Sequence, residues 1–131
     1  MAKIAPVYED WGGAEPGDGP ASPILDLVHL SRQTFGDHAL EMELLSLFDR
    51  QAEHFSARLS GDDAHAGGSR ADLAHTLKGS ARAVGAFALG DAAEAYEGAL
   101  RVGRDDRALR EPLVAAIATV RAAISELFER A

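Results

Sequence analysis

The chain has 131 residues, a formal net charge of -8 and no cysteine. This length corresponds to a single domain, and the acidic balance argues against nucleic acid as the main partner, because phosphate binding needs clustered lysine and arginine. The absence of cysteine excludes disulfides, thiolate catalysis and any cysteine-bound zinc or iron–sulfur centre. The content of 47% hydrophobic but only 6% aromatic residues favours a helical core of alanine and leucine.

The N-terminal segment differs in composition from the rest of the chain. Residues 1–21 contain four glycines, three prolines and four acidic residues, and such a segment cannot bury enough apolar surface to offset the cost of ordering it. We therefore predict a flexible arm over 1–21 and a helical domain over 22–131. Nothing in the sequence resembles a secretory signal or the roughly 18 apolar residues of a membrane span, so we expect a cytoplasmic protein that does not contact a membrane.

From Ser22 onward, apolar residues recur at three- and four-residue steps, which is the period of one helix face. The pattern predicts helices over residues 23–35, 38–60, 69–85, 87–102 and 105–130. No segment alternates with period two, so we expect no strand. Helices with short connections favour an all-α fold, an antiparallel four-helix bundle with the short first helix as an additional N-terminal cover.

The expected helix boundaries depend on a few polar residues and prolines. Ser22 can cap the first helix with Pro23 as its first residue, and Asp37 can cap the second. Pro112 lacks a backbone donor and clashes with the preceding turn, so we expect the last helix to break or to start near Glu111.

One histidine of the third helix lies on the face opposite the core. The apolar stripe of this helix consists of Leu73, Leu77, Ala81 and Val84. His75 lies about 155° from the centre of that stripe on a helical wheel, so we expect its ring to face solvent. An exposed imidazole with one accessible nitrogen is a competent nucleophile at neutral pH.

The residues that follow this histidine suit a phosphoryl group. Lys78 and Arg82 come three and seven residues after His75, so we expect two cations on the same surface, where they would stabilise negative charge near the ring. Gly79 costs about 1 kcal/mol relative to alanine inside a helix. Access to the His75 ring is one physical reason for a glycine here. Without a side chain on the next turn, there is room beside the ring for a bulky group or for another protein's backbone.

The segment HTLKGSARAVGA, residues 75–86, resembles the signature of the histidine-containing phosphotransfer (HPt) domain family. That pattern is roughly H-x-L-K-G-[SA]-[SA], then a Gly further along, and a Leu and a Glu on the next helix. The matching positions here are His75, Leu77, Lys78, Gly79, Ser80, Ala81, Gly85, Leu89 and Glu97. The stretch 35–37 with the leucines and phenylalanine that follow also resembles the family's entry into its second helix. The resemblance covers about residues 23–130 and departs from the pattern at Tyr96, where the family often has Leu, and at Pro112.

The resemblance implies a phosphorelay carrier, which is a signalling protein without an ATP site of its own rather than an enzyme. By position, His75 would carry the phosphoryl group on Nε2. Lys78 would help neutralise the charge of that group, and Gly79 would provide clearance. The group would come from the aspartyl phosphate of one receiver domain and pass to the aspartate of another.

The same resemblance implies the partners. They would be receiver domains of response regulators, with a hybrid histidine kinase as a further candidate, and Arg82, Ser80 and Ala83 would lie at the edge of the contact. We expect no cofactor on the chain itself, because the acidic site of the receiver would bring the Mg²⁺. We also expect a monomer.

Two other functions remain open from the sequence. The dimerisation half of a sensor kinase also carries a helical histidine, but there an acidic residue and then a proline usually follow, whereas Thr76 follows here and no proline occurs before Gly85. A helical adaptor that binds receivers without phosphotransfer is the other alternative.

The remaining polar patterns predict no site. Asp26–His29, Asp62–His65 and Asp72–His75 are spaced like the acid–histidine pairs of di-iron bundles, but such bundles use inward-facing glutamates, so we expect no metal site. The arginines at 101, 104, 107 and 110 form a basic cluster with Asp105 and Asp106 between them, which predicts a solvated turn.

Overall fold

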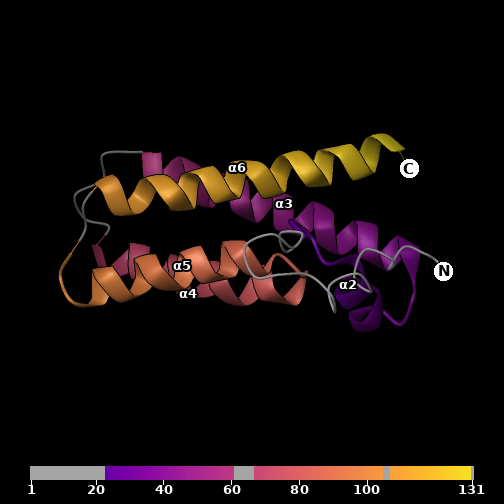
Figure 1. Cartoon of the computed structure of the whole chain (residues 1–131), viewed down its shortest axis with the longest axis horizontal. Helices are drawn as coiled ribbons and strands as arrows, with labels where there is room; N and C mark the ends of the chain where they lie inside the picture. The colour runs from indigo at the N-terminus through magenta and orange to yellow at the C-terminus, as the bar shows by residue number, and fades with distance from the viewer. Residues whose placement is uncertain (1–22, 61–66, 105–106, 131) are drawn as a thin grey trace, which may run out of the picture.

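The computed structural model describes residues 23–60, 67–104 and 107–130. These ranges contain no strand and five helices, namely α2 (Leu27–Gln33), α3 (His38–Ser60), α4 (Gly67–Ala83), α5 (Phe87–Arg101) and α6 (Arg107–Arg130). Figure 1 shows the four long helices lying lengthwise beside one another, with α2 at the end where α6 finishes. The predicted all-helical fold is therefore confirmed, while the arm predicted over 1–21 lies outside the described residues.

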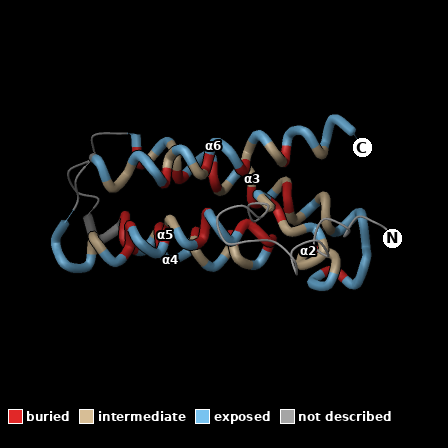
Figure 2. Tube along the Cα trace, viewed as in Figure 1, coloured by how far each residue is buried: buried red, intermediate tan, exposed pale blue. Residues whose placement is uncertain are grey.

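The core lies on the helix faces that the apolar periodicity predicts. On α4, Leu77 and Ala81 are fully buried and Val84 follows just beyond the helix at 6% exposure. The last helix buries residues at the predicted three- and four-residue steps, Leu113, Ile117, Val120 and Ile124. Figure 2 shows buried segments recurring along the long helices, between exposed ones.

Helices α4 and α5 make the most extensive contact between helices in the described part of the chain. Ala74 and Ala81 of α4 and Ala93 of α5 are completely buried, and small side chains let two helices approach closely. Tyr96 of α5 is also fully buried in the core. Because α4 and α5 run so close together, long side chains on the outer face of α4 can reach those of α5.

The first helix starts later than the sequence predicts. Helix α2 begins at Leu27, and its N-cap is Asp26, whose Oδ1 accepts the backbone N–H of His29 at 3.0 Å. The backbone N–H of Asp26 donates to the carbonyl of Gly85 at 2.9 Å. This bond holds Asp26 in an extended conformation, so a helix starting at Pro23 was the wrong prediction. The proposed cap, Ser22, lies outside the described residues.

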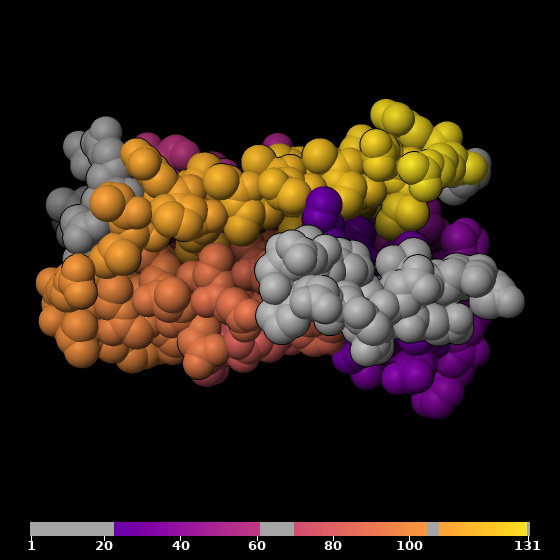
Figure 3. All heavy atoms as spheres, in the orientation of Figure 1, coloured from indigo at the N-terminus to yellow at the C-terminus, as the bar shows by residue number. Residues whose placement is uncertain are grey.

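The last helix is not interrupted at Pro112. Helix α6 runs from Arg107 to Arg130 with Pro112 inside it, so the expected break or start near Glu111 was wrong. Pro112 is exposed and lies in the second turn, close enough to the N-terminus that few backbone bonds precede it. The next residue, Leu113, is completely buried against the core, which favours continuing the helix through the proline. Figure 3 shows α5 and α6 meeting along the face toward the viewer.

The other predicted boundaries are close to those observed. Helix α3 spans the predicted 38–60, and Asp37 Oδ1 accepts the N–H of Leu40 at 3.1 Å, as a cap does. Helix α4 begins two residues before the predicted 69 and ends at Ala83 rather than 85. Helix α4 ends earlier because Gly85 adopts a φ of +89°, which lies outside the right-handed helical region.

Candidate functional site

The histidine singled out by the sequence lies on the outer face of α4. The side chain of His75 is 63% exposed, and that of Lys78 on the next turn is 20% exposed. A Cβ built on Gly79 would meet nothing within 4 Å. The described part of the chain therefore gives no packing reason for a glycine at this position, and the space beside His75 is open.

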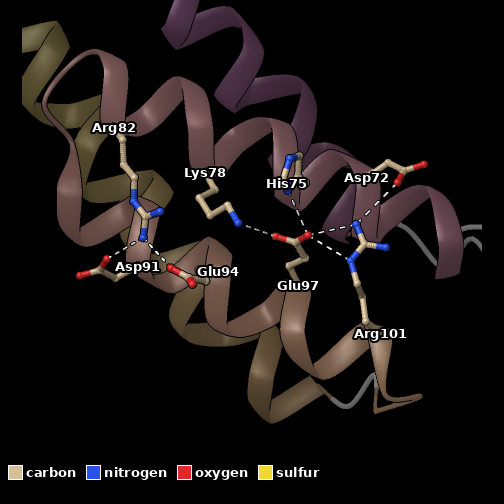
Figure 4. Close-up of polar contacts among 8 residues, drawn as sticks. All are labelled: Asp72, His75, Lys78, Arg82, Asp91, Glu94, Glu97 and Arg101. Atoms are coloured by element: carbon tan, nitrogen blue, oxygen red, sulfur yellow. Dashed lines mark hydrogen bonds and ion pairs between the residues drawn. The ribbon is translucent and has the colours of Figure 1, made fainter.

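Side chains from two helices converge on the carboxylate of Glu97, as Figure 4 shows. His75 Nδ1 lies 3.1 Å from Glu97 Oε2, and Lys78 Nζ lies 3.1 Å from Oε1. Arg101, one turn after Glu97 on α5, places Nε and Nη2 each 3.0 Å from Oε2. We call His75, Lys78, Glu97 and Arg101 the Glu97 cluster.

Glu97 is the buried centre of this cluster. Its side chain is only 10% exposed, and burial alone would raise the pKa of Glu97. Hydrogen bonds from Lys78 and Arg101, the charge of Lys78 and the contact with His75 outweigh burial, so the pKa lies below the ordinary value of 4.5. The carboxylate is therefore ionised at neutral pH, with the hydrogen-bond contacts of His75 and Arg101 on Oε2 and the ion pair with Lys78 on Oε1.

The geometry decides which nitrogen of His75 is available. An ionised carboxylate can only accept a hydrogen bond, so Glu97 beside Nδ1 keeps the proton on that nitrogen and fixes the tautomer of the ring. Nε2 then carries the lone pair, and the exposed side chain leaves it accessible from solvent.

Arg82 does not add its charge to the surroundings of His75 as the sequence suggested. Its Nη2 lies 3.0 Å from Asp91 Oδ1 and 2.6 Å from Glu94 Oε1, both on α5. The aliphatic part of Arg82 covers Gly90, where an added Cβ would come within 2.8 Å of Arg82 Cγ. Figure 4 shows this ion pair as a separate group beside the Glu97 cluster. Arg82 therefore links α4 to α5.

Ser80 and Ala83 face α3 and line a groove of about 340 Å³. The other lining residues are mostly apolar, Leu44, Leu47, Phe48, Gln51 and Val84. Leu47 is 48% exposed although it belongs to the apolar period of α3. The two small residues therefore form one wall of an apolar groove between α3 and α4, on the same helix as His75.

The other histidines of the described residues lie in separate places. His29 packs edge-on against Phe87 with ring centroids 5.0 Å apart, and His38 lies 3.6 Å from Glu41. His65 lies outside the described residues. Among residues 23–60, 67–104 and 107–130, no three His, Asp or Glu side chains gather as a metal site requires.

The sequence reasoning missed two features of the cluster. Glu97 appeared only as a position of the family pattern, without a role, and Arg101 was assigned to a solvated turn. The spacing of Glu97 and Arg101, four residues apart with the acid first, is the signal that could have paired them. The helix positions alone do not reveal that both face His75.

Comparison with known proteins identifies a matching family. The family model of the Hpt domain matches residues 42–130, which is most of the chain and includes the Glu97 cluster. Searches of curated proteins and of solved structures found no match. Within the part of the chain that the structure describes, no helix combines the length and apolar character that crossing a bilayer requires.

Proposed function

The chain belongs to the Hpt domain family, and on that premise we propose that it is a phosphorelay carrier that holds a phosphoryl group on His75. Hpt domains serve histidine phosphotransfer in two-component signalling, where they interact with receiver domains and histidine kinases. The observation that carries the proposal is the pairing of an exposed ring with a buried acceptor. His75 is 63% exposed while its Nδ1 lies 3.1 Å from Glu97.

In the proposed reaction, the lone pair of His75 Nε2 attacks the phosphorus of a receiver's aspartyl phosphate. The N–P bond forms as the P–O bond to the aspartate breaks, and the electron pair of that bond leaves with the aspartate carboxylate. The ring gains positive charge in this step, and the Nδ1 proton remains on the ring. Glu97 then stabilises the charged ring through that proton, because a carboxylate accepts more strongly from a cation. The reverse step passes the group to the aspartate of a second receiver.

Lys78 and Gly79 support this reaction in different ways. Lys78 Nζ lies at Glu97 Oε1, and its flexible stem allows the ammonium to turn toward a phosphoryl group on the neighbouring ring. Gly79 leaves open space one turn after His75, which admits the phosphoryl group and the receiver's backbone. Positioning and charge stabilisation of this kind account for most of the catalysis in phosphoryl transfer.

We propose that the receiver contacts the apolar groove between α3 and α4. Ser80 and Ala83 of the groove wall lie on the same helix as His75, and the exposed side chain of Leu47 is available for contact. In this proposal, Arg82 contributes less to docking than the sequence suggested, because Asp91 and Glu94 already bind its guanidinium. The receiver brings the Mg²⁺ and the acidic site, and the chain itself adds no ATP site.

The finer architecture belongs to the same proposal. We infer an antiparallel bundle of α3, α4, α5 and α6 with α2 as its cover, acting as a monomer in the cytoplasm. A carrier of this kind needs only one rigid surface that presents His75, and the four long helices supply it.

A labelling experiment tests the proposed role of His75. The full chain is incubated with a phosphorylated receiver domain, and acid-labile label on the chain is measured for the wild type, His75→Gln and His54→Gln. His54 is an exposed histidine on α3 and is the matched control. We expect label on the wild type and on His54→Gln and none on His75→Gln. Equal label on the wild type and His75→Gln would sink the proposal, and receiver binding without label on any of the three would favour the adaptor.

A further inference from the structure

Arg101 contacts the same carboxylate oxygen that faces the histidine. Its Nε and Nη2 each lie 3.0 Å from Glu97 Oε2, and His75 Nδ1 lies 3.1 Å from that oxygen. Nη2 also lies 3.8 Å from Asp72 Oδ1, one turn before His75 on α4. Arg101 therefore joins α5 to the turn of α4 that carries the histidine.

These contacts fix the orientation of the Glu97 carboxylate. Lys78 from α4 lies at Oε1, whereas Arg101 from α5 lies at Oε2. A carboxylate bound by a cation at each oxygen cannot rotate without losing one of the two contacts. Two nitrogens of the planar guanidinium meet at Oε2, so they define the position of that oxygen more narrowly than a single point charge would.

We propose that Arg101 is a positioning residue for His75 and acts through Glu97. Its guanidinium holds Oε2 toward Nδ1, so the ring proton stays on Nδ1 and Nε2 keeps the lone pair. Without Arg101, the carboxylate would move relative to the ring, and the proton would distribute between the two nitrogens. This inference rests on the proposed phosphoryl transfer at His75, but it makes a separate statement about the ring in the resting protein.

Three variants of the full chain separate positioning from charge. Arg101→Gln removes the fork and the charge, and Arg101→Lys keeps the charge but loses the fork. Arg121→Gln is the control, because Arg121 forms a comparable two-point contact with Asp49 between α6 and α3, away from the Glu97 cluster. Circular dichroism checks that all three keep the helical fold.

The first measurement is the tautomer of His75, read from ¹⁵N chemical shifts of its ring nitrogens. In the wild type and in Arg121→Gln we expect one tautomer with the proton on Nδ1. In Arg101→Gln we expect the two ring nitrogens to shift toward the values of a tautomer mixture, with Arg101→Lys between the two. Wild-type shifts in Arg101→Gln would overturn the proposal.

The second measurement is the rate of phosphorylation by a small phosphoramidate, which reaches His75 without any docking partner. We expect Arg101→Gln to slow this reaction about fivefold, and Arg121→Gln to leave it unchanged. The double variant Glu97→Gln with Arg101→Gln should react no more slowly than Glu97→Gln alone, because Arg101 acts through Glu97. Independent, multiplying losses in the double variant would contradict this and assign Arg101 to the phosphoryl group itself. If the wild type accepts no phosphoryl group from any donor, the proposed function fails, while the tautomer measurement still decides the role of Arg101.

Discussion

Gly79 on α4 and Gly98 on α5 both leave open space where a side chain would begin, and both lie inside helices. Gly79 lies one turn after His75, so a large side chain there would occupy the space of the incoming receiver. We expect Gly79→Leu to slow transfer from a phosphorylated receiver by about tenfold or more, whereas Gly98→Leu should not. Both changes should maintain or raise helix content, because leucine favours a helix by roughly 0.8 kcal/mol over glycine. Stopped-flow transfer rates and circular dichroism measure the two effects, and equal rates for both variants would refute the clearance role.

Glu97 makes the stability of the folded protein depend on pH. Burial opposes its charge, but the hydrogen bonds from Lys78 and Arg101 prevail and hold its pKa below 4.5. A carboxyl whose pKa is lower in the folded than in the unfolded chain stabilises the fold fully above the unfolded value, and this contribution is lost as the pH falls through the folded pKa. We expect Glu97→Gln to lower the free energy of unfolding by about 1–2 kcal/mol at pH 7.

Denaturant unfolding of the wild type and Glu97→Gln between pH 7 and pH 3 checks this prediction. The difference in stability between the two should stay constant down to about pH 4.5 and shrink below it. A difference that grows as the pH falls would show that the carboxylate is not held in its ionised form.

At the scale of residues, the sequence predicted the exposure of His75 correctly because that depends only on the period of one helix. It could not pair His75 with Glu97, because the part of α5 that faces α4 depends on how closely the two helices pack. The prediction that the charge of Arg82 acts near His75 was wrong for the same reason. Its partners Asp91 and Glu94 lie 9 and 12 residues further along, on another helix.

At the scale of elements, neighbouring residues were enough to predict the bounds of α3, which Asp37 caps. They were not enough for helices whose bounds depend on a contact with a distant part of the chain. The start of α2 depends on the bond between Asp26 and Gly85, and the continuity of α6 through Pro112 depends on the core around Leu113. Neither contact can be read from the residues next to the boundary.

The turn between α4 and α5 contains Gly85, which packs closely against the backbone of Asp26 before α2. Gly85 has φ +89°, and a Cβ there would lie 2.6 Å from the backbone oxygen of Asp26. We expect Gly85→Ala to destabilise the protein by about 1–3 kcal/mol and to loosen α2. Gly103→Ala is the control, because Gly103 has a similar φ of +81° but open space around it.

Thermal unfolding and amide hydrogen exchange of Leu30, which is buried in α2, measure the two effects of Gly85→Ala. Both Gly85→Ala and Gly103→Ala introduce backbone strain, so the difference between their stability losses measures the contact of Gly85 with Asp26. Equal stability losses with unchanged exchange at Leu30 would show that α2 does not depend on this contact.

At the scale of the whole molecule, the structure changes the expected charge around His75. The net charge is -8, and the sequence suggested a local positive surface from Lys78 and Arg82. In the structure, Lys78 lies at Glu97, and two carboxylates bind Arg82. With these cations paired, long-range electrostatic attraction is a weak explanation for receiver binding, and the apolar groove becomes the stronger one.

Charge placed in the groove tests this view of docking. Leu47 is 48% exposed in the groove between α3 and α4, and Phe128 is 39% exposed on α6, so either can be replaced without opening the core. We expect Leu47→Asp to weaken receiver binding about tenfold or more, because a buried charge at the centre of an apolar contact is costly, whereas Phe128→Asp should bind like the wild type. Titration calorimetry with a receiver domain measures the affinities, and phosphorylation by a small phosphoramidate should proceed at the same rate in both variants because that reaction needs no docking. If Leu47→Asp binds as tightly as the wild type, or if Phe128→Asp is the weaker of the two, the receiver docks on another face and His75 is reached from there.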